Sequence, residues 1–170
     1  MEKITAKSFL EYQYVSNPKF SPDGNYIAFI SQKADLESNG YRGDIYILKN
    51  GQCRKLTGAG DAKSYCWTPE NTLLFPAMRC PKQKKRAEEG ELFTPYYEIS
   101  PQGGEAQYAF TLPMKTSGLT HLDKELYYFV GEFYKNGPQT LEERKALLAK
   151  QAVYESFEEL PFLKQNQATQ

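Results

Sequence analysis

Few residues in the sequence could carry out acid–base or nucleophilic chemistry. His121 is the only histidine, and it precedes Leu122 at the end of an expected strand. A serine nucleophile is weak without a neighbouring base, and the Gly-x-Ser-x-Gly sequence that presents such a serine on a sharp turn does not occur. We therefore predict no catalytic residue in this chain and interpret His121 as a structural or surface residue.

Two loops resemble ligand-binding motifs without completing them. Asp35, Glu37 and Asn39 have the spacing with which a calcium loop begins, but its twelfth position is Tyr46, where a bidentate glutamate is required. The glycine-rich stretch 58–64 lacks the Gly-Lys pair of a phosphate loop, and it is expected to join two strands rather than a strand and a helix. Both stretches are interpreted as connecting loops, and no cofactor is predicted.

The cysteines do not suggest a metal site either. Cys53, Cys66 and Cys80 are odd in number and lack the paired close spacing of zinc ligands. We interpret them as free thiols, buried or incidental. No bound metal is predicted.

The charge balance argues against a polyanionic partner. Lysine plus arginine equals aspartate plus glutamate at 21 each, so no net field favours nucleic acid or an anionic membrane. The basic run Lys82–Arg86 could be a nucleic-acid or targeting patch, but Glu88 and Glu89 follow it directly, which favours a solvated loop or short helix. We predict neither nucleic-acid nor membrane binding.

Targeting signals are not evident in the sequence. The N-terminal residues 1–15 mix charged and isolated apolar side chains, without the continuous apolar segment of a secretory signal. No later run reaches the length of a membrane span. A cytoplasmic location is therefore expected.

The strand signals begin with the turn Ser21-Pro22-Asp23-Gly24. Proline presets the backbone of the first central turn position, and glycine accepts conformations that other residues resist. The following strand places Tyr26, Ala28 and Ile30 on one face and Ile27 and Phe29 on the other. Since both faces are apolar, we expect this strand to have a sheet on each side.

This unit recurs along the chain. A strand over 43–49, the hairpin signal Asn50-Gly51 and a returning strand complete a four-stranded meander. The turn Thr68–Asn71 then repeats Ser21–Gly24 at an offset of 68 − 21 = 47. The stretch Tyr96–Ser100 is matched to Asp44–Leu48 at an offset of 96 − 44 = 52.

Four-stranded units that repeat at roughly 40 to 50 residues are typical of a β-propeller. We predict an all-β fold: a partial β-propeller of about two and a half four-stranded antiparallel blades, with a short N-terminal helix and a C-terminal helix. Blade 1 covers about 15–57, blade 2 about 62–110, and the start of blade 3 about 113–134. A capping box of Thr140 and Glu143 opens the last helix, which is expected to reach about Tyr154 within the helix and tail 140–170.

The same residues carry a family resemblance. The succession VSNPKFSPDGNYIAFISQKAD, GDIYILKNGQCRKLT and LLFPAMR resembles the start of the propeller domain in serine peptidases of the prolyl oligopeptidase family. The similarity is to the bacterial dipeptidyl aminopeptidase and acylaminoacyl-peptidase branch, and it covers about residues 1–162. TolB-like propellers share SPDG-type blades.

The resemblance implies a gating role rather than catalysis. In that family the propeller lies over a C-terminal α/β-hydrolase domain that holds the Ser-Asp-His triad, and no triad position can be carried onto this chain. The partners it implies are peptide substrates, reached through the full-length enzyme, and the missing blades and hydrolase domain. The alternative is a non-catalytic, TolB-like module that binds peptides or proteins and self-associates.

The C-terminal end departs from the family pattern. Residues 163–170 are polar where another blade should start, from which we expect a premature stop or frameshift near Phe162. Glu158 and Glu159 cannot be matched to the carboxylates with which some family members hold a substrate amine. They are interpreted as an exposed acidic turn.

Overall fold

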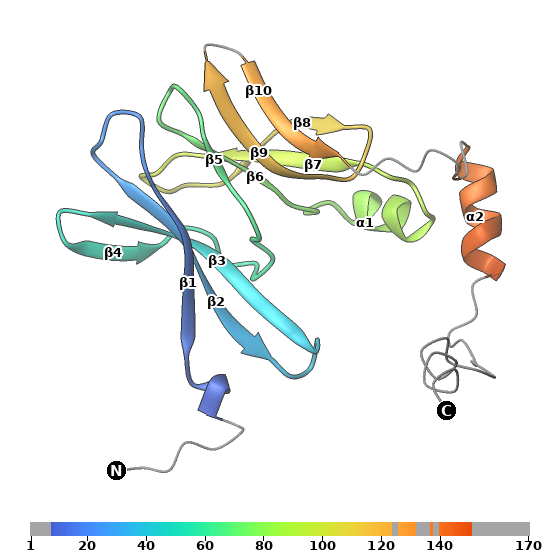
Figure 1. The fold of residues 1–170 in the computed structure, drawn as a ribbon, viewed down its shortest axis with the longest axis horizontal. Helices are drawn as coiled ribbons and strands as arrows, with labels where there is room; N and C mark the ends of the chain where they lie inside the picture. The colour runs from blue at the N-terminus through green and yellow to red at the C-terminus, as the bar shows by residue number, and fades with distance from the viewer. Residues whose placement is uncertain (1–7, 124–125, 132–136, 138–139, 151–170) are drawn as a thin grey trace, which may run out of the picture.

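The first sheet is a four-stranded antiparallel meander. The computed structural model describes residues 8–123, 126–131, 137 and 140–150, and begins with a 3-10 turn, η1 (Ser8–Leu10), where the sequence predicts a short helix. The strand order follows the chain, β1-β2-β3-β4, so each strand pairs with the next one (Figure 1). The strands are β1 (Gln13–Phe20), β2 (Ile27–Asp35), β3 (Gly40–Lys49) and β4 (Gln52–Lys55).

A second four-stranded sheet repeats this strand order, and two further strands form a third sheet. The second sheet is β5-β6-β7-β8, and helix α1 lies in the connection from β6 to β7. Two further strands form an antiparallel pair, and helix α2 follows (Figure 1). The elements are β5 (Cys66–Trp67), β6 (Leu73–Pro76), α1 (Pro81–Glu88), β7 (Thr94–Ile99), β8 (Gln107–Leu112), β9 (Thr116–Asp123), β10 (Leu126–Gly131) and α2 (Leu141–Lys150). The predicted all-β, partial-propeller class is confirmed.

The two predicted turns are built alike. Gly24 and Asn71, at the same place in each turn, have φ angles of 71° and 60°, the left-handed region that glycine and asparagine tolerate best. In the first turn the Ser21 hydroxyl accepts the Tyr26 N–H at 3.0 Å, and in the second the Thr68 hydroxyl accepts the Thr72 N–H at 3.2 Å. The offset of 47 is confirmed for these turns, and the second turn is one residue shorter.

The second offset is wrong by one residue. Ile27 pairs with Leu48 in blade 1 and Leu73 pairs with Ile99 in blade 2, so the β3 and β7 strands are related by 99 − 48 = 51, not 52. A slip of one residue moves every side chain to the other face of a strand. Both faces of these strands are apolar, and the hydrophobic pattern therefore left the register open.

Blades 1 and 2 stack face to face around one core. Blade 1 contributes mainly small and branched side chains, and blade 2 contributes mainly aromatic and leucine side chains. As predicted, Ala28 and Ile30 of β2 are buried on the same side as Tyr26, which directly precedes the strand. The contributors from blade 1 are Tyr26, Ala28, Ile30, Ile45 and Ile47, and those from blade 2 are Trp67, Leu73, Phe75, Tyr97 and Ile99.

Blade 2 is covered on its other face as well. Leu74 and Tyr96 pack against Leu119 of β9, with Tyr127 of β10 at the edge of the cluster. The Cys66 thiol lies in this cluster, where its Sγ accepts the backbone N–H of His121 at 3.1 Å. Burial raises the pKa of the Cys66 thiol, which makes it a poor nucleophile.

Tyr65 fastens the connection between the blades onto blade 1. Its hydroxyl lies 2.6 Å from the carbonyl oxygens of both Asn17 and Ala28, in strands β1 and β2. Burial raises its pKa, so the hydroxyl stays protonated and can donate. We expect Tyr65→Phe to lower the free energy of unfolding by about 1–3 kcal/mol, because a buried carbonyl loses its donor. Urea denaturation measures this change, and an unchanged midpoint would contradict it.

The predicted C-terminal helix begins where its capping box places it. The Thr140 hydroxyl accepts the Glu143 N–H and the Glu143 carboxylate accepts the Thr140 N–H, each at 3.2 Å. The expected extension to Tyr154 lies outside the described residues. Within the described part of the chain, neither helix has the length and apolar character needed to cross a bilayer.

Candidate functional site

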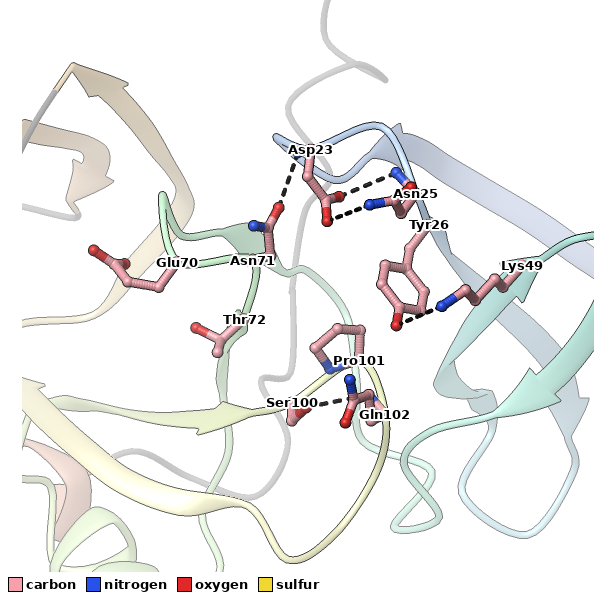
Figure 2. Close-up of a pocket in the computed structure, with 10 residues that line it drawn as sticks. All are labelled: Asp23, Asn25, Tyr26, Lys49, Glu70, Asn71, Thr72, Ser100, Pro101 and Gln102. Atoms are coloured by element: carbon pink, nitrogen blue, oxygen red, sulfur yellow. Dashed lines mark hydrogen bonds between the residues drawn. The ribbon is translucent and has the colours of Figure 1, made fainter.

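A polar cleft of about 350 Å³ opens between blades 1 and 2. It is formed where four turns of the two blades end at the same edge of the stack (Figure 2). Two of these turns belong to blade 1 and two to blade 2, so the cleft exists only when the blades are stacked. The lining residues are Asp23, Asn25, Tyr26, Lys49, Glu70, Asn71, Thr72, Ser100, Pro101 and Gln102.

Tyr26 and Lys49 form one wall of the cleft. The Lys49 ammonium donates to the Tyr26 hydroxyl at 3.0 Å, and its Nζ lies 4.4 Å from the centre of the same ring. The hydrogen bond from Lys49 lowers the pKa of Tyr26. This wall thus presents a phenol oxygen and an ammonium side by side (Figure 2).

Asp23 lies at the rim and joins the two blades. Its backbone N–H donates to the Asn71 side-chain oxygen at 2.9 Å across the blade boundary. Its carboxylate accepts from the Ser21 hydroxyl at 2.6 Å and from the Asn25 backbone and side-chain N–H groups. The Ser21 hydroxyl and the Asn25 groups lower the pKa of this carboxyl.

The Asp23 contacts predict an acid-sensitive turn. A carboxyl whose pKa is lower in the folded than in the unfolded chain stabilises the fold above its unfolded pKa of about 4, and this contribution is lost as pH falls through the folded pKa. We expect Asp23→Asn to be less stable than the wild-type chain near neutral pH, with the difference shrinking below about pH 4. Thermal unfolding of both proteins across this range measures it. A difference independent of pH would contradict the assignment.

The opposite wall carries hydroxyl and amide groups. Thr72 hydrogen-bonds to Thr68 at 2.6 Å and to the Glu98 carboxylate, and the Ser100 hydroxyl accepts the Gln102 N–H at 3.2 Å. The cleft can therefore hold a polar group through several hydrogen bonds. Among its lining residues there is no histidine, so the Thr72 and Ser100 hydroxyls have no imidazole base beside them in the cleft.

His121 lies away from the cleft, on β9. Its ring meets the Tyr127 ring edge-on with centroids 5.1 Å apart, and its backbone binds the Cys66 sulfur. The side chain is partly buried where the third blade packs on the second. This position fits the structural interpretation made from the sequence.

The two loops with partial ligand motifs both connect strands in the structure. Asp35 accepts hydrogen bonds from Glu37 N and the Ser38 hydroxyl within the exposed β2–β3 turn. The stretch 58–64 joins β4 to β5 and runs along Gly43 of β3, as expected for a connection between strands. In the described residues no three His, Cys, Asp or Glu side chains cluster as metal ligands would.

The basic run forms helix α1, the short-helix alternative. Arg86 of this run pairs with Glu91, which offsets part of its charge, whereas Glu89 pairs with Lys145 of α2 at 3.0 Å. Of the cysteines, Cys53 is exposed, Cys66 buried and Cys80 intermediate, and all are free. Glu158 and Glu159 lie outside the described residues.

Sequence reasoning missed the cleft itself. Its lining residues come from four turns that are separated by up to 79 residues, 102 − 23, and none of the turns carries a binding motif on its own. The repeat offset of 47 was the one available signal, because it places the turns of adjacent blades at the same edge.

Comparisons with known proteins establish the fold of this chain. Scans of protein-family models and of curated proteins find no match. Among solved structures, an acylaminoacyl peptidase in complex with Z-Gly-Gly-Phe-chloromethyl ketone is 19% identical with a TM-score of 0.51, over 68% of this chain and 16% of that chain. Pyrococcus horikoshii acylaminoacyl peptidase is 20% identical with a TM-score of 0.50, over 66% and 16%.

A third similar structure is itself a propeller domain. The β-propeller domain of the Trilobed protease from Pyrococcus furiosus is 19% identical with a TM-score of 0.46, over 66% of this chain and 32% of that chain. The chain thus spans between a sixth and a third of the length of these proteins. At such identities the likeness concerns the fold alone.

Proposed function

We propose that this chain is the N-terminal propeller portion of a serine-type oligopeptidase of the prolyl oligopeptidase family, and that it gates access of peptides to a separate hydrolase domain. The observation that carries the proposal is the stack of two four-stranded blades and the first two strands of a third blade. This stack is similar to acylaminoacyl peptidase over 68% of the chain. The sequence resemblance in the same blades points to the same family.

In this proposal the chain contributes surfaces and not bond cleavage. The cleft between the blades offers hydrogen-bonding groups, whereas the only histidine lies between blades 2 and 3. The nucleophile and its base would then lie in the hydrolase domain of a longer polypeptide. The propeller would act by limiting which peptides reach that domain.

Gating requires that the blades hold together, which can be tested at Asn71. Asn71→Gly keeps the positive φ angle but removes the side-chain oxygen that binds Asp23 across the blade boundary. In the native polypeptide that carries these residues, we expect it to raise hydrolysis of long peptides relative to a dipeptide substrate. The expected change is about two- to tenfold, since one hydrogen bond contributes about 0.5–1.5 kcal/mol.

A matched control is available in the β3–β4 hairpin of blade 1. Asn50 also has a positive φ angle, 50°, in the β3–β4 hairpin, and Asn50→Gly should leave the ratio unchanged. An equal effect of both substitutions, or none at Asn71, would argue against gating by blade separation.

A further inference from the structure

We infer that the cleft between blades 1 and 2 binds the C-terminal carboxylate of a short peptide. Lys49 and the Tyr26 hydroxyl of blade 1 hold the carboxylate together with the Gln102 side-chain amide of blade 2 (Figure 2). The carboxylate follows from the hydrogen-bond donors in the cleft. The peptide that carries it rests on the proposed peptidase function.

Lys49 brings a positive charge without a carboxylate partner. One N–H of its ammonium donates to the Tyr26 hydroxyl at 3.0 Å. Within the described residues, no aspartate or glutamate forms a salt bridge with it. Two N–H groups of the ammonium are therefore left for a ligand, and hydrogen bonds from a charged donor to an anion are among the strongest in proteins.

The Tyr26 hydroxyl supplies a second donor. The residue is only 8% exposed, and its hydroxyl opens into the cleft beside Lys49 (Figure 2). Hydrogen bonds from Lys49 and, as a smaller effect, from the Gln102 side chain lower the pKa of Tyr26. A phenol oxygen that accepts these bonds still carries its own proton, and no group in the described part of the chain accepts that proton. An acceptor in the cleft would satisfy it.

The acidic residues of the lining favour a singly charged anion. The Asp23 carboxylate is occupied by the Ser21 hydroxyl and by two N–H groups of Asn25. The Glu70 carboxylate points away from Lys49, on the other side of the cleft (Figure 2). With one ammonium and two carboxylates in the lining, a dianion such as inorganic phosphate is repelled more strongly than a carboxylate.

The rest of the cleft suits a short peptide backbone. The Asn71 side-chain NH₂ and the Ser100 hydroxyl proton have no acceptor among the described residues, so both can donate to peptide carbonyls. The volume of about 350 Å³ is at the lower end of the roughly 300–1,000 Å³ found for ligand sites. A bound peptide would thus contact both blades and span their boundary.

The test compares a peptide acid with its amide. The native polypeptide that carries these residues is first treated with a fluorophosphonate, which blocks any activated serine. Isothermal titration calorimetry then measures the binding of tri-L-alanine, its C-terminal amide, acetate and inorganic phosphate. We expect the peptide acid to bind about tenfold or more tightly than each of the other three, because only the acid offers both a carboxylate and a peptide backbone.

Three variants assign this preference to the cleft, and circular dichroism verifies that they fold. Lys49→Gln should abolish the difference between acid and amide, because it removes the ammonium. Gln102→Ala, in the other blade, should weaken binding of the acid by about two- to tenfold. The control is Lys84→Gln, which changes an exposed lysine of α1 in the β6–β7 connection, at the opposite edge of blade 2, and should bind like the wild type.

Equal binding of acid and amide, or an undiminished difference in Lys49→Gln, would overturn the inference. Acetate or phosphate that bound as tightly as tri-L-alanine would overturn the peptide assignment. Failure of the proposed function has a different signature, the absence of fluorophosphonate labelling. A preference for the acid that disappears in Lys49→Gln would support the carboxylate site even then.

Discussion

Replacing Phe75 by alanine is expected to lower the free energy of unfolding by about 3–5 kcal/mol, the range for removing a fully buried aromatic side chain. Phe75 is 1% exposed and lies in the core between blades 1 and 2. The substitution removes the ring and leaves a cavity that two packed sheets cannot easily close. Urea denaturation monitored by Trp67 fluorescence measures the loss.

The matched control is the same substitution at the protein surface. Phe9, in η1, is 41% exposed, and Phe9→Ala should cost well under half as much. Equal losses at both positions would mean that the blade interface contributes no more to stability than the surface does. That result would contradict the stacked-blade core.

Gly43→Ala is expected to destabilise the fold by about 1–3 kcal/mol, the usual cost of overpacking. A Cβ at this position would lie 2.5 Å from the backbone oxygen of Ala62, and 3.1 Å from the Gln32 side chain. Ala62 cannot retreat freely, because its N–H donates to the Gly43 carbonyl at 2.9 Å. Thermal unfolding should show a clear decrease in Tm.

Gly58 provides the comparison, because it lies in the connection 58–64 that runs along Gly43. A Cβ there meets no atom within 4 Å, and its φ angle is not in the left-handed region. Gly58→Ala should therefore be neutral within about 0.5 kcal/mol. If the two variants lost equal stability, the close approach of the connection to β3 would be in doubt.

The turns could be predicted from sequence because their chemistry is local. A hydroxyl at the first position and glycine or asparagine at the fourth are enough to specify the turn, and both copies have the expected hydrogen bonds. The capping box of Thr140 and Glu143 was predictable for the same reason. Each of these features involves residues within five positions of one another.

The register of β7 depends on contacts that are distant in sequence. Tyr96 and Tyr97 point to opposite faces of blade 2, one toward blade 3 and the other toward blade 1. When both neighbours of a strand are sheets, either residue could occupy either face, so the pattern does not determine which pairs with Phe75. Only the stacked structure resolves it.

The cleft also depends on how the blades stack, which no local sequence pattern specifies. Asp23 meets Asn71 only because adjacent blades place their turns at one edge. The sequence predicted a sheet on each side of β2, and the structure supplies one: Ala28 and Ile30 are buried, while Ile27 and Phe29 are half-buried on the face of blade 1 that points away from blade 2.

The central claim is that the chain is the gating part of a serine peptidase. The most direct test is the intact mass of the native polypeptide that carries this N-terminus, combined with its labelling by a fluorophosphonate, which reacts with activated serines. We predict a polypeptide much heavier than 19.5 kDa that is labelled, while the 170-residue chain alone is not. A native polypeptide of 19.5 kDa that takes no label would contradict the claim.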